Sequence, residues 1–145
     1  MGYSNRDSTY AGRQYPVSRV VQPRRAGLLS SFRFASEGIV YALRTQRNFR
    51  IHLAITGLVV AVGMWLELSA LSWALLALTV GGVLVTEVFN TAAERLVDLV
   101  SPDYHPLAKQ VKDLMAGAVL IAAVASIIVG VFVLGPPLVS ALGWG

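Results

Sequence analysis

The chain has no cysteine, and charged residues make up only 14% of its 145 residues. The lack of cysteine excludes a disulfide framework, a thiolate metal site and a cysteine nucleophile. The scarcity of charge argues against an ordinary soluble domain, in which about 25% of residues are charged. Since 55% of the residues are hydrophobic, long apolar runs are expected, and their lengths favour a lipid-facing surface over a buried core.

The net charge of +4 is distributed unevenly along the chain. Residues 1–50 contain nine arginines against two acidic residues, which leaves +7, and residues 51–145 contain three basic and six acidic residues, which leaves −3. A basic end is also typical of nucleic-acid binding, but arginine next to an apolar body marks the cytoplasmic side of a membrane protein. We therefore expect a cytoplasmic N-terminus.

Two polar segments precede the apolar part of the chain. Residues 1–26 are rich in Tyr, Ser, Gly, Pro and Arg without an apolar period, so we predict a disordered cytoplasmic tail, with an organelle transit peptide as the alternative. In residues 27–47 apolar side chains recur every three or four positions, which predicts an amphipathic helix. It is too polar to cross a bilayer, so we expect it to lie in the membrane interface. A soluble helix packed on another element is the alternative.

Three apolar segments follow, and they predict transmembrane helices at about 50–67, 70–100 and 111–135. A tight turn at Glu67 joins the first two, and Pro102 and Pro106 separate the second from the third. The pair Pro136-Pro137 is expected to end the third helix. The predicted fold class is therefore all-α integral membrane, with an N-terminal interfacial amphipathic helix and three transmembrane helices in a domain spanning 27–145.

A polar stripe occupies the cytoplasmic end of the second span. Its members are Glu87, Asn90, Thr91, Glu94 and Asp98. At about 100° per residue, these positions fall within about a third of the helix circumference. Simple solvation near a helix end is the alternative, strongest for Asp98 and weakest for Glu87, because the preceding apolar run puts Glu87 at membrane depth. Ionisable groups at that depth are functional candidates.

Other polar residues are expected on the same side of the membrane. They include the loop residues Asp103, Tyr104, His105, Lys112 and Asp113, and the segment 46–52. Carboxylates can hold Mg²⁺ on nucleotide phosphates, and lysine or arginine can neutralise a transferring phosphoryl group. A carboxylate within the membrane can take the proton of a lipid hydroxyl. The residues suggest a phosphotransferase with an acceptor in the bilayer, although neither a Walker A nor a protein-kinase motif is present.

The segment EVFNTAAERLVD, from Glu87 to Asp98, resembles the E-x-x-N-[ST]-A-[IA]-E-x-x-V-D signature of the prokaryotic diacylglycerol kinase/undecaprenol kinase family. NFRIHL, which starts at Asn48, YHPLAK, which starts at Tyr104, and KDLMAGAVL, which starts at Lys112, are also similar to that family. The resemblance implies a homotrimer whose active sites are built partly from a neighbouring subunit. It also implies phosphorylation of undecaprenol or diacylglycerol by MgATP, at the cytoplasmic interface of a prokaryotic cell membrane.

The same resemblance implies a role for individual residues. Glu87 would be the general base on the lipid hydroxyl, and Asn90 would help to position that hydroxyl. Glu94 would ligate Mg²⁺. The nucleotide would be bound by Gln46, Glu94, Asp103, Tyr104, His105, Lys112 and Asp113.

Gln46 departs from the family pattern, which often has a second metal-binding carboxylate at this position. Its amide oxygen can still ligate Mg²⁺ beside Glu94 but brings no negative charge, and Glu37 is a candidate for compensation. A catalytically inactive family member is therefore an open alternative. Another is a trimeric scaffold or cation-binding protein with a ring of Glu87 and Glu94 side chains. The motifs favour a polyprenol slightly over diacylglycerol as the acceptor.

Overall fold

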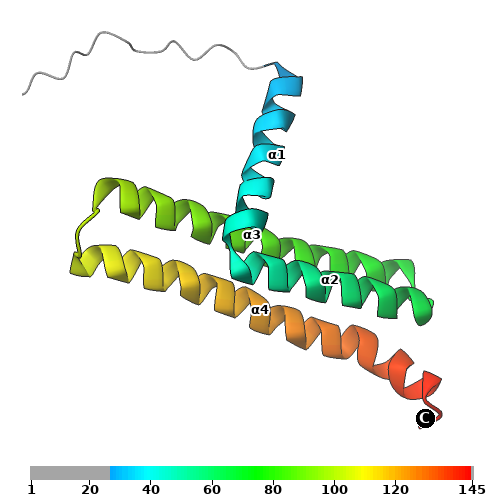
Figure 1. Ribbon diagram of the computed structural model, residues 1–145. Helices are drawn as coiled ribbons and strands as arrows, with labels where there is room; N and C mark the ends of the chain where they lie inside the picture. Colours follow the sequence, from blue (N-terminus) through cyan, green and yellow to red (C-terminus); the bar gives the residue numbers. More distant parts are fainter. Residues whose placement is uncertain (1–26, 145) are drawn as a thin grey trace, which may run out of the picture.

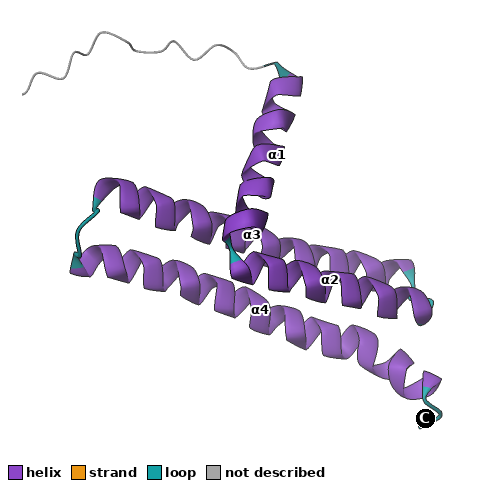
Figure 2. Ribbon diagram, in the orientation of Figure 1, coloured by secondary structure: helices purple, strands orange, loops and turns teal. Residues whose placement is uncertain are grey.

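The computed structural model describes residues 27–144, which form helices joined by short connections (Figure 1). The elements are α1 (Leu28–Thr45), α2 (Arg47–Trp65), α3 (Ala70–Val100) and α4 (Pro106–Ala141). Within this range Figure 2 shows helix and loop only, so the predicted all-α fold class is confirmed. The predicted tail, residues 1–26, lies outside the described residues.

Three helices are long and apolar enough to cross a membrane, as the sequence predicted. The mean hydropathies of α2, α3 and α4 reach 1.3, 1.8 and 2.8 over their most apolar windows. The 19 residues of α2 correspond to about 28 Å at 1.5 Å per residue, close to the thickness of a hydrocarbon core. The 31 residues of α3 extend about 46 Å. Part of α3 and α4 therefore continues past the start of α2, on the side of their connecting loop (Figure 1).

Gln46 separates α1 from α2 and redirects the chain. Its backbone is extended, with φ −102° and ψ 118°, and its N–H closes the last turn of α1 on the Ala42 carbonyl. As a result α1 runs crosswise to the three long helices (Figure 1). Ala42 and Phe49 are buried on either side of this break, and the Arg95 guanidinium of α3 lies 5.5 Å from the centroid of the Tyr41 ring. The contact between Tyr41 and Arg95 joins α1 to α3.

The connection between α2 and α3 is a tight turn at Glu67, as predicted. Glu67 has a φ of 51°, the left-handed conformation needed to reverse the chain in so few residues. Ser69 caps α3 by accepting the N–H of Ser72 at 3.2 Å. Beside the turn, the ring of Trp73 lies against the backbone of Gly63, which has no side chain to keep it away. The two helices are therefore packed closely at this end.

The prediction that Pro136-Pro137 ends the last helix is wrong, because α4 continues through both prolines to Ala141. A proline removes one backbone donor, but its fixed φ of about −65° is compatible with helix. Interruptions of this kind are tolerated in membrane helices. The start of α4 also differs from the prediction: it lies at Pro106, within the first turn, where proline has no hydrogen bond to lose.

Candidate active site

The first part of the polar stripe of α3 faces the inside of the bundle, whereas Glu94 is half-buried and Asp98 is exposed. Glu87, Thr91 and Asn90 are 2%, 5% and 8% exposed, and they are the buried polar residues of the described chain. The Thr91 hydroxyl donates to the Glu87 backbone carbonyl at 2.9 Å, so it is satisfied within its own helix. The other two side chains offer their functional groups to the interior. The helical spacing in the sequence predicted this shared face correctly.

The carboxylate of Glu87 lies beside an imidazole from another helix. His52 Nε2, on α2, is 3.3 Å from Glu87 Oε1. Their approach is not aligned as a hydrogen bond, and this carboxylate oxygen accepts none from the described residues. A buried carboxylate requires a proton, a counter-charge or a bound group to offset its lost hydration. Glu87 is therefore compensated by a proton, by the neighbouring imidazole or by a bound group.

One turn along the stripe, Asn90 orients Glu94. The Asn90 amide Nδ2 donates to Glu94 Oε1 at 3.0 Å. The Asn90 Oδ1 atom is buried and has no donor among the described residues. This side chain therefore fixes one carboxylate oxygen of Glu94 and presents an acceptor oxygen of its own. Both features suit a site that binds a hydroxyl or a hydrated cation.

A second cluster lies where α3 and α4 meet their connecting loop. A pocket of about 400 Å³ is lined there by all five predicted loop residues, Asp103, Tyr104, His105, Lys112 and Asp113. His105 also caps α4, because its Nδ1 atom accepts the N–H of Leu107 at 3.2 Å. The ring of Tyr104 projects freely, with 81% of the residue exposed. The α3–α4 loop and the start of α4 thus bring these polar side chains around one opening.

Two lysine–carboxylate pairs line this pocket. Lys112 Nζ lies 2.6 Å from Asp98 Oδ1, which ties α4 to the last turn of the α3 stripe. Lys109 pairs with Asp113 one turn away on α4. The Asp98 carboxylate is therefore more than a solvated group near a helix end, the alternative considered above. An ammonium group has three donors, so Lys112 can keep Asp98 and still bind an anion.

The residues considered as metal ligands are not brought into one cluster. Within residues 27–144 there is no group of three His, Asp or Glu side chains placed to hold an ion. Gln46 is half-buried at the junction between α1 and α2. Glu37 instead pairs with Arg33 at 3.5 Å, on the exposed side of α1. Any metal here would need oxygen ligands from outside these residues, such as phosphate or water.

Two contacts of the site were not predicted from the sequence. In the sequence His52 is part of a motif in the first span, and nothing there indicates its position beside Glu87. The Asp98–Lys112 pair joins residues 14 positions apart across the loop. The only sequence signal for either contact was charge complementarity between neighbouring helices, which does not specify a partner.

Comparison with known proteins identifies relatives for most of the chain. Residues 33–134 match the family described as prokaryotic diacylglycerol kinase. A diacylglycerol kinase from Synechocystis is 47% identical over 130 residues, which cover 89% of this chain and 74% of the relative. The undecaprenol kinase of Bacillus subtilis is 44% identical over 108 residues, covering 74% and 88%. A diacylglycerol kinase from Escherichia coli K12 is 32% identical over 95 residues, covering 66% and 78%.

Proposed function

Because this chain belongs to the prokaryotic diacylglycerol kinase family, we propose that it transfers the γ-phosphoryl group of ATP to the hydroxyl of a membrane lipid alcohol. The names of its relatives suggest diacylglycerol or undecaprenol as the acceptor. The observation that carries the proposal is the Glu87 carboxylate, which is 2% exposed and shares a helix face with Asn90 and Glu94.

Glu87 is the general base of the proposed reaction. A lipid hydroxyl that reaches the inside of the bundle gives its proton to the carboxylate while its oxygen attacks the γ-phosphorus, and ADP leaves. The buried position excludes water, which would otherwise compete as the acceptor and hydrolyse ATP. The free Oδ1 of Asn90 can accept a hydrogen bond from the lipid headgroup and hold it near the base.

The pocket at the α3–α4 loop is the proposed nucleotide site. Lys112 supplies a positive charge that its contact with Asp98 keeps aimed along the α3 stripe. A cation at this place stabilises the negative charge on the phosphate oxygens during transfer. Asp103 and His105 line the same opening, and the exposed ring of Tyr104 is available to stack on the base.

The donor atoms near Glu94 fit a hydrated Mg²⁺ ion. This ion prefers oxygen ligands and usually takes one or two carboxylates together with substrate phosphates and water. Asn90 occupies one carboxylate oxygen of Glu94 and leaves the other for a metal. Gln46, at the α1–α2 junction, has a neutral amide oxygen, but no observed contact joins it to Glu94. Bound Mg²⁺ would neutralise the phosphate oxygens of ATP. The shortage of protein ligands is consistent with a metal that arrives bound to the nucleotide.

The charges support a cytoplasmic location for this site. Arg44, Arg47 and Arg50 surround the α1–α2 junction, and Lys109 and Lys112 follow the α3–α4 loop. Basic residues beside membrane spans are retained on the cytoplasmic side. ATP is available there, and α1 would lie along the same interface.

Phosphate transfer from γ-labelled ATP in detergent micelles tests the proposal, with diacylglycerol and a polyprenol offered separately. We expect labelled lipid from the wild type and a loss of at least about 10³-fold in Glu87→Gln, which removes the base without changing its shape. Glu67→Gln is the matched control, since it makes the same change at the distant α2–α3 turn. Equal labelling by wild type and Glu87→Gln would contradict the role of the base.

Gln46 supports one alternative function, that of an inactive family member. A neutral ligand in place of a carboxylate weakens Mg²⁺ binding, and the described residues contain no cluster of three acidic or histidine side chains that could compensate. Gln46→Glu restores the charge at the same backbone position. Labelled lipid from Gln46→Glu but not from the wild type would favour the inactive member. No label from either would favour a scaffold or cation-binding protein.

A further inference from the structure

His52 lies between the buried Glu87 and a partly open pocket lined by α2, α3 and α4. The Glu87 side chain is 2% exposed, whereas that of His52 is 21% exposed. Their 3.3 Å contact joins α2 to α3 at the level of the proposed base. On the other side of the imidazole, His52 lines a separate pocket that is not part of the nucleotide site. The histidine therefore stands between the base and a second compartment.

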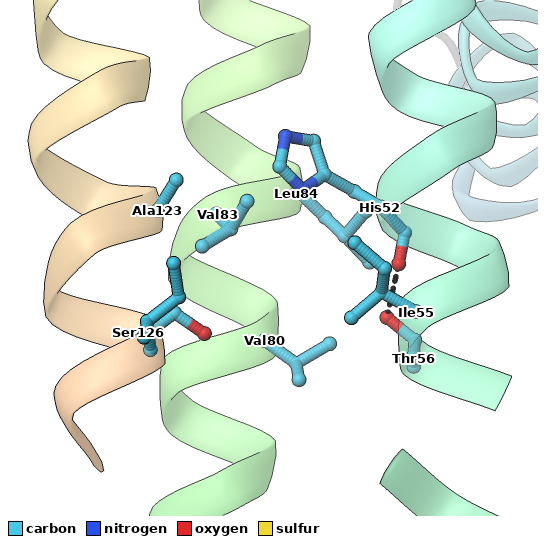
Figure 3. Close-up of a pocket in the computed structure, with 9 residues that line it drawn as sticks. His52, Ile55, Thr56, Val80, Val83, Leu84, Ala123 and Ser126 are labelled. Carbon is cyan, nitrogen blue, oxygen red and sulfur yellow. Dashed lines mark hydrogen bonds between the residues drawn. The ribbon is translucent and has the colours of Figure 1, made fainter. Parts of the chain in front are cut away.

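This second compartment lies between α2, α3 and α4 and has a volume of about 100 Å³. Figure 3 shows the imidazole at one end of the pocket and Ser126 with Val80 at the other. Thr56 also lines it, with its hydroxyl donating to the His52 carbonyl at 2.7 Å. One water needs about 10–15 Å³ of such volume, together with polar partners. The pocket is large enough for several waters, and although most of its lining is apolar, it includes the polar residues His52, Thr56 and Ser126.

The proposed reaction produces a proton that Glu87 has to release. The lipid O–H bond breaks, a new O–P bond forms, and the bond between the γ-phosphorus and the bridging oxygen of ADP breaks. The proton is then on the Glu87 carboxylate. A second lipid hydroxyl cannot be deprotonated until this proton leaves. Since the carboxylate is nearly inaccessible, the proton needs a group that contacts both the carboxylate and water.

We propose that His52 is the positioning residue that relays this proton from Glu87 to water in the pocket, an inference that rests on the proposed function. Once the imidazole turns into line with the carboxylate 3.3 Å away, the Glu87 proton passes to Nε2. This gives an imidazolium ion, and Nδ1 releases a proton to water. The imidazole returns to its neutral form and the carboxylate is again free to act as the base. No oxidant, metal or further reactant is needed.

No other described group is placed to perform this step. Glu94, the next carboxylate on α3, lies two turns away and is bound by Asn90. The parts of α4 that line the pocket, Ala123, Ser126 and Ile127, do not titrate. On α2, Thr56 is hydrogen-bonded to its own helix. Histidine is also the side chain whose ordinary pKa lies closest to neutral pH, as a relay requires.

Chemical rescue of His52→Ala tests the relay. This variant enlarges the pocket by the size of the lost ring, so a small azole can enter. We expect kcat to fall about 10²-fold, with little change in the KM for ATP. Imidazole should restore at least about a tenfold increase in kcat, because it can accept and return a proton. Pyrazole has nearly the same shape but is a much weaker base, so it should restore nothing.

Two further variants make the outcome decisive. Glu87→Gln with imidazole should remain inactive, because the relay serves that carboxylate. His52→Gln keeps an N–H donor but cannot carry a proton, so we expect a wild-type melting temperature with low kcat. Full activity of His52→Gln, or equal rescue by pyrazole and imidazole, would overturn the relay and leave the kinase proposal intact. An inactive wild type would instead overturn the proposed function and this inference with it.

Discussion

Lys112 shows how one side chain can serve both packing and binding. Its amine lies 2.6 Å from Asp98 in the proposed nucleotide pocket. Charge-assisted hydrogen bonds contribute about 1.5–3 kcal/mol, so loss of one to a phosphate weakens binding roughly tenfold to a hundredfold. We expect Lys112→Ala to raise the KM for ATP by about that factor. The KM for the lipid should change little.

Measurement of initial rates against ATP and lipid concentrations checks this prediction. Lys109→Ala is the comparison variant, because it makes the same truncation one turn earlier, where the amine is paired with Asp113. Its ATP dependence should stay closer to the wild type. An unaltered ATP dependence in Lys112→Ala would exclude the phosphate contact.

Glu94→Gln tests the proposed metal ligand. The amide keeps an oxygen that can accept from Asn90, which now donates at 3.0 Å, so the stripe should retain its geometry. The loss of negative charge weakens the binding of a hard cation far more than the binding of a neutral lipid. We expect the Mg²⁺ concentration for half-maximal rate to rise about tenfold or more. Titration of Mg²⁺ at saturating ATP measures it, and a change confined to the lipid KM would show that the metal assignment is wrong.

At this scale, the sequence predicted which residues are polar and share a helix face, but not what they contact. The positions of Glu87, Asn90 and Glu94 follow from the helical period alone. The imidazole beside Glu87 comes from α2 and the lysine beside Asp98 from α4. Those pairings depend on how the helices are rotated against each other, which is determined by packing along their whole length.

Among the elements, the α2–α3 pair depends most visibly on a single glycine. A Cβ atom at Gly63 would lie 2.8 Å from Trp73 Cη2 and 3.0 Å from Leu68 Cδ1. Real Cβ contacts are longer, so the rigid indole would have to move. Overpacking of this kind costs about 1–3 kcal/mol. We expect Gly63→Ala to lower the melting temperature of the protein in micelles.

Gly57→Ala is the matched control for this prediction, because it lies on the same helix and a Cβ there has no atom within 4 Å. Both changes improve helix propensity by about 1 kcal/mol, so only the steric contact differs between them. Circular dichroism during heating compares the two. A melting temperature of Gly63→Ala equal to that of Gly57→Ala would show that the Trp73 contact does not limit packing.

The three long helices were largely predictable because their apolar segments are about as long as a membrane-spanning helix needs to be. The turn at Glu67 and the end of α3 at Val100 were recognised from charge and proline. The extent of α4 is not predictable in this way, since Pro136-Pro137 indicates a helix end but the helix continues to Ala141. The sequence shows where a backbone donor is missing, but not whether packing on α3 keeps the helix intact.

For the whole molecule, the length of the polar stripe and the incomplete metal site raise the question of whether one chain supplies a whole site. Along α3, the 11 residues from Glu87 to Asp98 correspond to about 16 Å. A hydroxyl and the phosphorus it attacks must come within about 3–3.5 Å. A nucleotide held by one subunit and a base from its neighbour would satisfy this requirement in a homotrimer.

Subunit mixing tests this composite site. Glu87→Gln and Lys112→Ala remove opposite halves of the site, and each protein alone should be nearly inactive when ATP is kept low. If each site takes its base from one subunit and its lysine from the next, random trimers from an equal mixture contain intact sites. In half of the sites the subunit that supplies the base has an intact Glu87, and in half of those the neighbour that supplies the lysine has an intact Lys112. Activity should therefore recover to about a quarter of the wild type.

The control is the same mixture without subunit exchange, with the two proteins purified and combined in micelles just before the assay. It should show only the sum of the two residual activities. In the test itself, the two proteins are unfolded and refolded together so that their subunits exchange. If this mixture recovers no activity, each site lies within one chain. The distance along α3 must then be covered by the extended triphosphate of a single ATP. Recovery would instead mean that Lys112 and Glu87 of one chain serve two different reactions, so that only the assembled protein contains a complete site.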